Sequence, residues 1–75
     1  MNGFTTANSV YYVDLANRRI TGGKLGNKTM RFATGAMFMI GQPGVAYFVD
    51  DNDNPLYTND GRWARIKTGT ITGYI

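Results

Sequence analysis

Nucleophilic and acidic side chains are few in this sequence, and they lack the partners that catalysis needs. All five acids are Asp, and the 75 residues include no Glu, His or Cys. The chain therefore lacks the commonest general base, a thiol nucleophile and the ligands of Cys- or His-based metal sites. Its one Ser, Ser9, has no His to activate it. No glycine-rich loop leads into a helix that would hold a phosphate. We therefore expect that the protein is not an enzyme and that it binds no cofactor.

The acidic segment Asp50–Asn54 supplies the carboxylate and amide oxygens that hard cations prefer. A calcium-binding EF-hand loop, however, needs Gly at its sixth position and Glu at its twelfth. Counted from Asp50, these positions hold Pro55 and Gly61. Asp and Asn side chains also form hydrogen bonds to the backbone in tight turns. The sequence therefore predicts a solvated hairpin tip here and no metal site.

Charge is segregated along the chain. The segment between Asp14 and Asp50 carries five basic residues and no acid, residues 50–61 carry four Asp and no base, and residues 62–75 add three basic residues. The net charge is only +3, which is low for a dedicated nucleic-acid-binding protein. The oppositely charged blocks are also candidates for complementary faces of a head-to-tail contact between copies.

A basic aromatic face is expected around Trp63. In an extended strand over residues 62–67, alternate side chains share a face, so Trp63, Arg65 and Lys67 lie together. An indole beside two cations is a platform for stacking bases and contacting phosphates. With Arg31, these residues form the predicted nucleic-acid site. The alternative is that Arg65 and Lys67 are ordinary solvent-facing side chains and that Trp63 covers the end of a barrel.

The segment Ala36–Ile40 is apolar at every position. Such a strand is either buried on both sides or has an outer face that docks on another subunit. Met37 and Met39 would form that interface. Chains below ~70–80 residues without disulfides or metals gain only ~3–5 kcal/mol from their own core, so self-association would stabilise this one. Both interpretations remain open.

Turn-forming residues divide the chain into short strands. Asp60-Gly61 predicts a two-residue type I′ hairpin, and Gln42–Val45 predicts a type II turn. Asp14–Asn17 and Asp50–Pro55 predict longer hairpin loops. The expected strands lie near residues 9–14, 19–25, 28–33, 36–40, 45–50, 56–59, 62–67 and 70–75.

A helix over Ser9–Ile20 competes with the first two of these strands, because Tyr12, Leu15 and Arg19 recur there at helical spacing. Four consecutive strand-favouring residues, Val10–Val13, indicate a strand instead.

An internal duplication is a further hypothesis. A shift of 36 residues aligns Tyr11–Asp14 with Tyr47–Asp50, and a shift of 34 aligns Met30–Met37 with Ala64–Ile71. Recurrence at a fixed period is typical of repeated supersecondary units. A chain of several hairpins also aligns with itself by chance, so both explanations stay open.

The last 13 residues, Trp63–Ile75, resemble in outline one unit of the aromatic- and glycine-rich hairpin repeats of bacterial cell-wall-binding modules. Those repeats build ligand sites from Trp and Tyr of successive units. This chain has a single Trp, and Met30-Arg31-Phe32 stands where a second aromatic pair would be needed. Carbohydrate binding through Trp63, Tyr57 and Tyr74 is the third functional hypothesis.

The sequence as a whole predicts one all-β domain over residues 1–75, with residues 1–8 as a flexible N-terminal arm. The expected architecture is a small antiparallel barrel or sandwich built from hairpins, SH3-like or OB-like in scale. The expected core consists of Val10, Tyr12, Leu25, Phe32, Phe38, Ile40, Phe48, Leu56, Ile66 and Ile71.

The leading functional hypothesis is a non-catalytic module for protein binding and assembly. It would self-associate through Met37 and Met39 as part of a larger structure such as a virion or a surface assembly. The alternative is a small nucleic-acid-binding barrel. No apolar run is long enough to span a membrane, and the first residues lack the basic and apolar regions of a secretory signal. We expect no membrane partner, and the compartment is left open.

Overall fold

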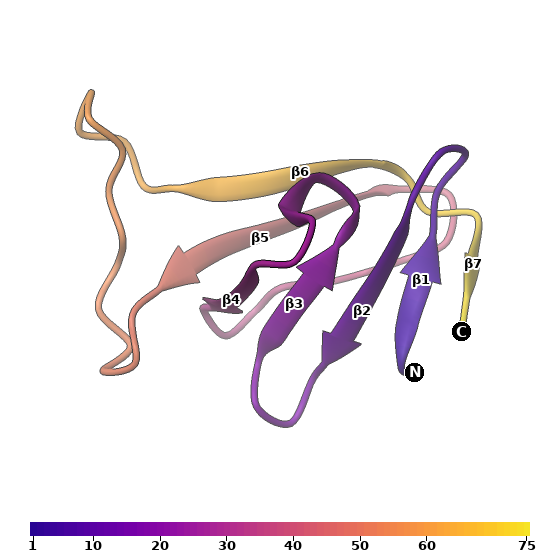
Figure 1. Ribbon diagram of the computed structural model, residues 1–75, viewed down its shortest axis with the longest axis horizontal. Coiled ribbons are helices and arrows are strands. Elements are labelled where there is room, and N and C mark those ends of the chain that lie inside the picture. Colours follow the sequence, from indigo (N-terminus) through magenta and orange to yellow (C-terminus); the bar gives the residue numbers. More distant parts are fainter.

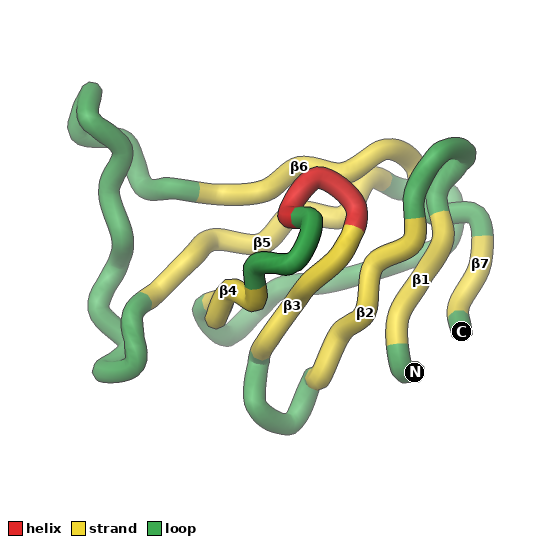
Figure 2. The backbone as a smooth tube through the Cα atoms, in the orientation of Figure 1, coloured by secondary structure: helices red, strands yellow, loops and turns green.

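In the computed structural model, which describes residues 1–75, the chain forms a seven-stranded antiparallel sheet. The strands are β1 Gly3–Thr5, β2 Val10–Asp14, β3 Arg19–Gly22, β4 Thr29–Phe32, β5 Pro43–Val49, β6 Arg65–Thr70 and β7 Gly73–Tyr74, with a 3-10 turn, η1 Gly23–Leu25. Their order across the sheet is β6-β5-β4-β3-β2-β1-β7 (Figure 1). The sheet curls into a half-barrel (Figure 2), which confirms the predicted all-β, barrel-like fold.

β2 and β3 form a hairpin because Asp14 organises the loop between them. Asp14 accepts hydrogen bonds from the backbone N of Asn17 at 3.1 Å and from its side-chain Nδ2 at 2.8 Å. Both bonds lower the pKa of the Asp14 carboxyl, and the bond from the Asn17 side chain has the larger effect. The predicted loop over Asp14–Asn17 is confirmed. The competing helix over Ser9–Ile20 is wrong, because these residues form strands instead.

The side chains of β2 face opposite to the prediction. Tyr11 and Val13 are buried in the core, whereas Val10 and Tyr12 are 40% and 56% exposed. The cause lies in β1, where Phe4 pairs with Tyr11 and stacks on its ring with the centroids 5.1 Å apart. Since neighbouring strand residues point to opposite faces, burying Tyr11 turns Val10 and Tyr12 out of the core.

Residues 3–5 belong to the sheet, so the predicted flexible arm over residues 1–8 is wrong for this segment. β1 lies between β2 and β7, and Phe4 is fully buried. The two chain ends lie side by side (Figure 1), and Asn2 N donates to Ile75 O at 2.7 Å. An apolar side chain in a short strand can thus anchor a segment that composition alone marks as mobile.

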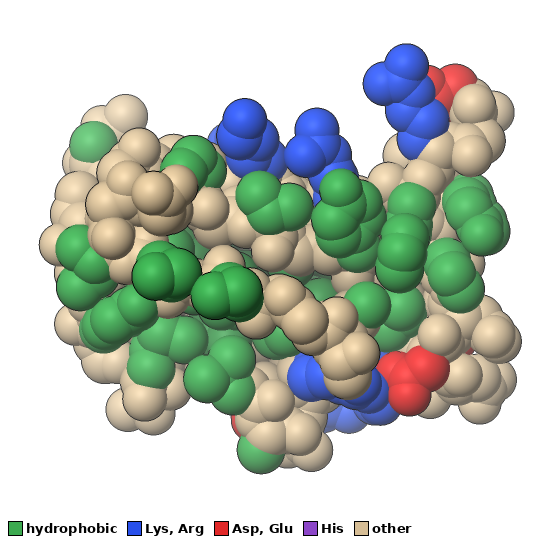
Figure 3. All heavy atoms as spheres, turned by 180° about the vertical axis from the view of Figure 1, so that it is seen from behind, with side chains coloured by type: hydrophobic (Ala, Val, Ile, Leu, Met, Phe, Trp, Pro, Cys, Tyr) green, Lys and Arg blue, Asp and Glu red, His purple; other side chains and the backbone are tan.

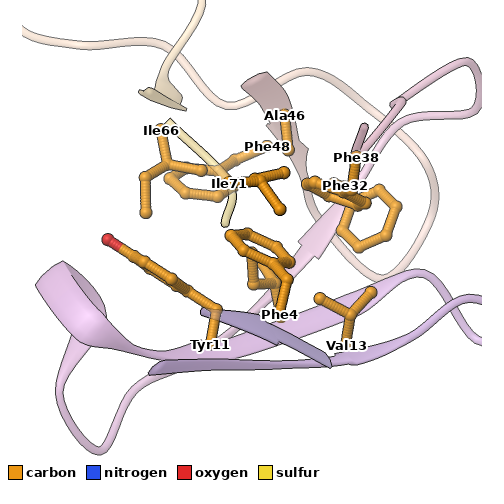
Figure 4. Close-up of a cluster of buried hydrophobic side chains, with 10 residues drawn as sticks. Phe4, Tyr11, Val13, Phe32, Phe38, Ala46, Phe48, Ile66 and Ile71 are labelled. Carbon is orange, nitrogen blue, oxygen red and sulfur yellow. The ribbon is translucent and has the colours of Figure 1, made fainter. Parts of the chain in front are cut away.

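A row of aromatic side chains fills the concave side of the sheet (Figure 4). Tyr11, Phe4, Phe38 and Phe32 contact one another in series, with ring centroids 5.1, 5.2 and 5.7 Å apart. The other members of the core are Val13, Ile20, Ala46, Phe48, Ile66 and Ile71.

Half of the predicted core lies where it was expected. The confirmed positions are Phe32, Phe38, Phe48, Ile66 and Ile71. Leu25 and Leu56 are only partly buried and pack against the core from its margin, and Val10, Tyr12 and Ile40 are exposed. Sequence pattern identified the large side chains of the later strands better than those of the first hairpin.

Residues 36–40 do not form the predicted strand. Met37 makes a single bridge to Val45, and Phe38 then turns into the core. Met37 and Met39, on either side of it, are 66% and 51% exposed. The segment is therefore an irregular loop that inserts one aromatic ring and leaves both methionines on the surface.

The type II turn of this region lies earlier than predicted. Gln42 N donates to Met39 O at 3.1 Å, and Gly41 at the third position has φ 89°. The turn thus spans Met39–Gln42, and Pro43 already begins β5. The predicted turn over Gln42–Val45 is wrong, because an earlier glycine takes the position with positive φ.

The hairpin at Asp60-Gly61 is present, but its turn differs from the prediction. Thr58 N donates to Arg62 O at 2.8 Å, and Gly61 N donates to Thr58 O at 3.0 Å, so the loop has three residues. Gly61 has φ 82°, whereas Asp60 is not among the residues with positive φ. A type I′ turn needs positive φ at both. The flanks are joined by a single isolated bridge, Tyr57↔Trp63, so residues 56–59 are not a regular strand.

The 36-residue self-alignment does not correspond to a structural repeat. It places buried Tyr11 on Tyr47, which is 40% exposed, and exposed Tyr12 on buried Phe48. The two aligned aromatic pairs therefore present opposite faces to the core, although the aligned Val13 and Val49 are both buried.

We expect Gly61→Val to lower the free energy of unfolding by at least ~1 kcal/mol, because a β-branched residue is poorly accommodated at positive φ. Nothing lies within 4 Å of a Cβ built at Gly61, so the cost arises from the backbone alone. Gly61→Asn is the matched control, since Asn tolerates this conformation and should lower the free energy of unfolding by less. Urea denaturation measures both, and a Val variant as stable as the wild type would contradict the observed turn.

Candidate functional site

A shallow groove of about 370 Å³ lies on the convex side of β5. Ala46 and Phe48 point into the core, so the alternate residues Val45 and Tyr47 point outward into the groove. Met37, Pro43 and Trp63 also line the groove, together with residues 33–36. Figure 3 shows apolar side chains spread over this side of the molecule, with Lys and Arg side chains along its upper margin. We call it the aromatic groove.

Trp63 is fixed at one end of the groove by two contacts. Its indole Nε1 donates to Phe48 O at 2.7 Å, and its ring lies 4.9 Å from that of Tyr47 with a 45° tilt. The indole remains 38% exposed. Trp63 and Tyr47 thus form a preorganised aromatic pair whose nitrogen already has its hydrogen-bond partner.

Arg65 and Lys67 lie on the same side of β6 as Trp63, as the strand period predicted. They alternate with the buried Ile66 and pair across the ladder with Tyr47 and Val45, respectively. Cross-strand partners share a face of the sheet, so both cations border the aromatic groove.

Tyr47 is a groove residue that the sequence hypothesis missed. The predicted burial of Phe48 already implied that Tyr47 faces outward. Only the strand pairing Tyr47↔Arg65, however, places it beside Trp63. The sequence could therefore predict that Tyr47 points outward, but it could not predict that Tyr47 contacts Trp63.

Arg31 does not join this face, because its guanidinium binds Asp53. The Nε and the second terminal nitrogen of Arg31 both lie 3.2 Å from Asp53 Oδ1, and Arg18 reaches the same oxygen at 2.7 Å. The hydrogen bond from Arg18 is the largest cause of the lowered pKa of the Asp53 carboxyl. The basic and acidic blocks of the sequence thus neutralise each other, in part, within one molecule.

The acidic segment forms the turn that its Asp and Asn residues predicted. Asp50 Oδ1 accepts hydrogen bonds from the backbone N of Asn52 at 2.8 Å and of Asn54 at 2.9 Å. Asp53 points to the two arginines instead. Asp50 accepts the hydrogen bonds of the turn and Asp53 forms the ion pairs, whereas Asp51 does neither.

The apolar surface extends beyond the aromatic groove. Met39 and Ile40, next to the groove residue Met37, are 51% and 56% exposed, and Tyr57 is 67% exposed. The alternative in which Met37 and Met39 are buried in the core is therefore wrong, and both side chains are accessible. We use the name convex face for the aromatic groove together with Met39 and Ile40.

The three residues of the carbohydrate hypothesis are not all brought together. Tyr57 and Trp63 form a bridge across the hairpin. Tyr74 lies in β7, at the other end of the strand order from β6, and its hydroxyl donates to Phe38 O. Two aromatic side chains on one hairpin remain from this prediction.

No protein-family model, curated protein or solved structure matches this chain. No helix of the fold has the length and apolar character that crossing a membrane requires.

The two ion pairs of Asp53 make the stability of the fold sensitive to acid. The folded state lowers the pKa of Asp53 below its ordinary value of 3.8. The ionised carboxyl therefore stabilises the fold in full above that value, and its contribution is lost as the pH falls through the lowered pKa. We expect the melting temperature of Asp53→Asn to decline less steeply than that of the wild type between about pH 5 and about pH 2.

Asp51→Asn is the matched control for this measurement, because it removes an exposed carboxyl that makes no ion pair. In this variant, the melting temperature should decline with falling pH as steeply as in the wild type. Asp14, whose pKa is also lowered, supplies a residual pH dependence in all three proteins. Equal slopes in Asp53→Asn and the wild type would contradict the role given to the arginine pairs.

Proposed function

We propose that this chain is a non-catalytic protein-binding and assembly module that associates with copies of itself through the convex face. The observation that carries the proposal is the exposure of Met37 and Met39, at 66% and 51%, on both sides of a buried Phe38. Contiguous exposed apolar surface marks interaction sites in small proteins. Methionine suits such a surface because its flexible thioether adapts to irregular partners.

The small core supports self-association in particular. Only 14 of the 75 residues are buried, while twelve large apolar side chains are exposed. Covering part of this apolar surface with a second copy would add burial that the single chain lacks. In a two-fold arrangement, the methionines of each copy would meet the aromatic groove of the other.

Nucleic-acid binding by the predicted residues has less support. Arg31 is held by Asp53, and Trp63 is anchored to Phe48 O and packed on Tyr47. Arg65 and Lys67 remain as cations of that hypothesis without ion pairs. Two such contacts supply little of the counterion release on which phosphate-backbone affinity depends.

The test replaces both methionines by charge. We expect wild-type protein to sediment as a dimer or larger species, and the double variant Met37→Lys with Met39→Lys to sediment as a monomer. The variant should keep its far-UV circular dichroism spectrum, because both side chains already contact solvent.

Leu15→Lys is the matched control, because Leu15 is 49% exposed but lies in the loop between β2 and β3, outside the convex face. It should retain the wild-type mass. A wild-type protein that is monomeric at its highest soluble concentration would overturn the proposal, and so would a double variant that still associates.

A further inference from the structure

β6 has one unpaired edge, because it is the end strand of the sheet. Phe48 N donates to Ala64 O, and Ala46 pairs with Ile66. In an antiparallel ladder the backbone groups alternate in direction, so those of Arg65 and Lys67 point away from β5. They face a seam lined by residues of β6 and of η1.

One side chain crosses this seam. Lys24 Nζ donates to Lys67 O at 2.8 Å, while the backbone N of Lys24 donates to Tyr11 Oη at 3.2 Å and holds η1 in place. The N–H and C=O of Arg65 and the N–H of Lys67 have no such partner. Unpaired strand edges are ready templates for another strand.

The seam widens into a cleft of about 450 Å³ whose walls are basic and whose floor is apolar. The basic residues that line it are Lys24, Arg65 and Lys67, none of which forms an ion pair, and no acid lines the cleft. The side chains of Arg65 and Lys67 stand on the outward side of β6, where the cleft borders the aromatic groove. The apolar residues are Leu25, Phe48 and Ile66. A depression walled by one sign of charge concentrates ligands of the opposite sign.

We propose that the seam binds a short, extended acidic segment of a partner protein, which adds to β6 as a further strand. Its backbone would pair with the N–H and C=O of Arg65 and the N–H of Lys67, and it would displace Lys24 Nζ from Lys67 O. Its acidic side chains would meet the three cations of the cleft, and an intervening apolar side chain would enter the floor. The seam adjoins the convex face at Arg65 and Lys67, but its partner differs, and the proposal does not rest on self-association.

The length of the segment follows from the ends of the accessible edge. Beyond Lys67 the strand meets the turn between β1 and β2, since a Cβ built on Gly69 would lie 3.6 Å from Thr6 Cβ, and we take Arg65 and Lys67 as the pairing positions. Pairing with Arg65 and Lys67 alone accommodates roughly three or four residues of an antiparallel strand.

The charges and the strand edge together favour a peptide over nucleic acid. A nucleic acid would neutralise the cations but leave the backbone groups of Arg65 and Lys67 unpaired. Phe48, the one aromatic ring of the floor, is buried and offers no stacking surface. Pairing of β6 with β6 of a second copy would bring like charges together, which disfavours that occupant.

The test uses a capped synthetic peptide of alternating Asp and Val, titrated into ¹⁵N-labelled protein at low salt. We expect saturable shifts of the amide signals of Arg65 and Lys67. The same peptide N-methylated at alternate residues keeps its charge but cannot complete the ladder, and it should bind at least about tenfold more weakly. This comparison needs no variant of the protein.

A charge-reversal variant gives the second measurement. Lys24→Glu with Lys67→Glu should weaken peptide binding about tenfold or more, whereas Lys28→Glu with Arg19→Glu makes the same change of net charge outside the seam and should cost much less. Circular dichroism verifies that each variant is folded. Repeating the titration with the methionine double variant separates this site from self-association.

Three outcomes would overturn the proposal. They are an absence of peptide binding at low salt, equal affinity of the N-methylated peptide, and tighter binding of a single-stranded oligothymidine that shifts the same two amides. The second outcome would indicate charge attraction without strand addition, and the third would assign the seam to nucleic acid.

Discussion

The stacking of Phe4 between Tyr11 and Phe38 is the interaction on which the other features depend. It joins the first strand, the second strand and a loop that has no regular structure, with ring centroids 5.1 and 5.2 Å apart. Because Tyr11 is drawn inward, Tyr12 faces solvent; because Phe38 is drawn inward, Met37 and Met39 face solvent. The same packing that buries the aromatic core therefore exposes the apolar side chains next to it in the sequence.

The sequence predicted what local chemistry determines and missed what distant packing decides. Asp14 and the glycine at position 61 define hairpins within a few residues, so both hairpins were found. The run Val10–Val13 is apolar at nearly every position, so its pattern selects no face. That choice is made by Phe4, in a segment whose composition predicted a flexible arm. Arg31 likewise meets Asp53 across 22 positions of sequence, which no local pattern shows.

The candidate surfaces follow the same division. The shared face of Trp63, Arg65 and Lys67 was predicted from the two-residue period of a strand. The seam was not, because it requires knowledge of which strand ends the sheet and where η1 lies. β6 consequently borders two surfaces of different chemistry: Arg65 and Lys67 lie between the apolar convex face and the seam, and the free backbone edge of β6 faces the seam.

The pairing of β7 with β1 has a kinetic consequence. It joins residues 4–5 to residues 73–74, so it closes a loop of nearly the whole chain, and contacts of such separation form late in folding. A two-residue strand also opens locally at little cost in free energy, so its amides should exchange with solvent early. When β7 opens, the Tyr74 hydroxyl leaves Phe38 O. Fraying at this end of the sheet therefore reaches the loop that carries Met37 and Met39.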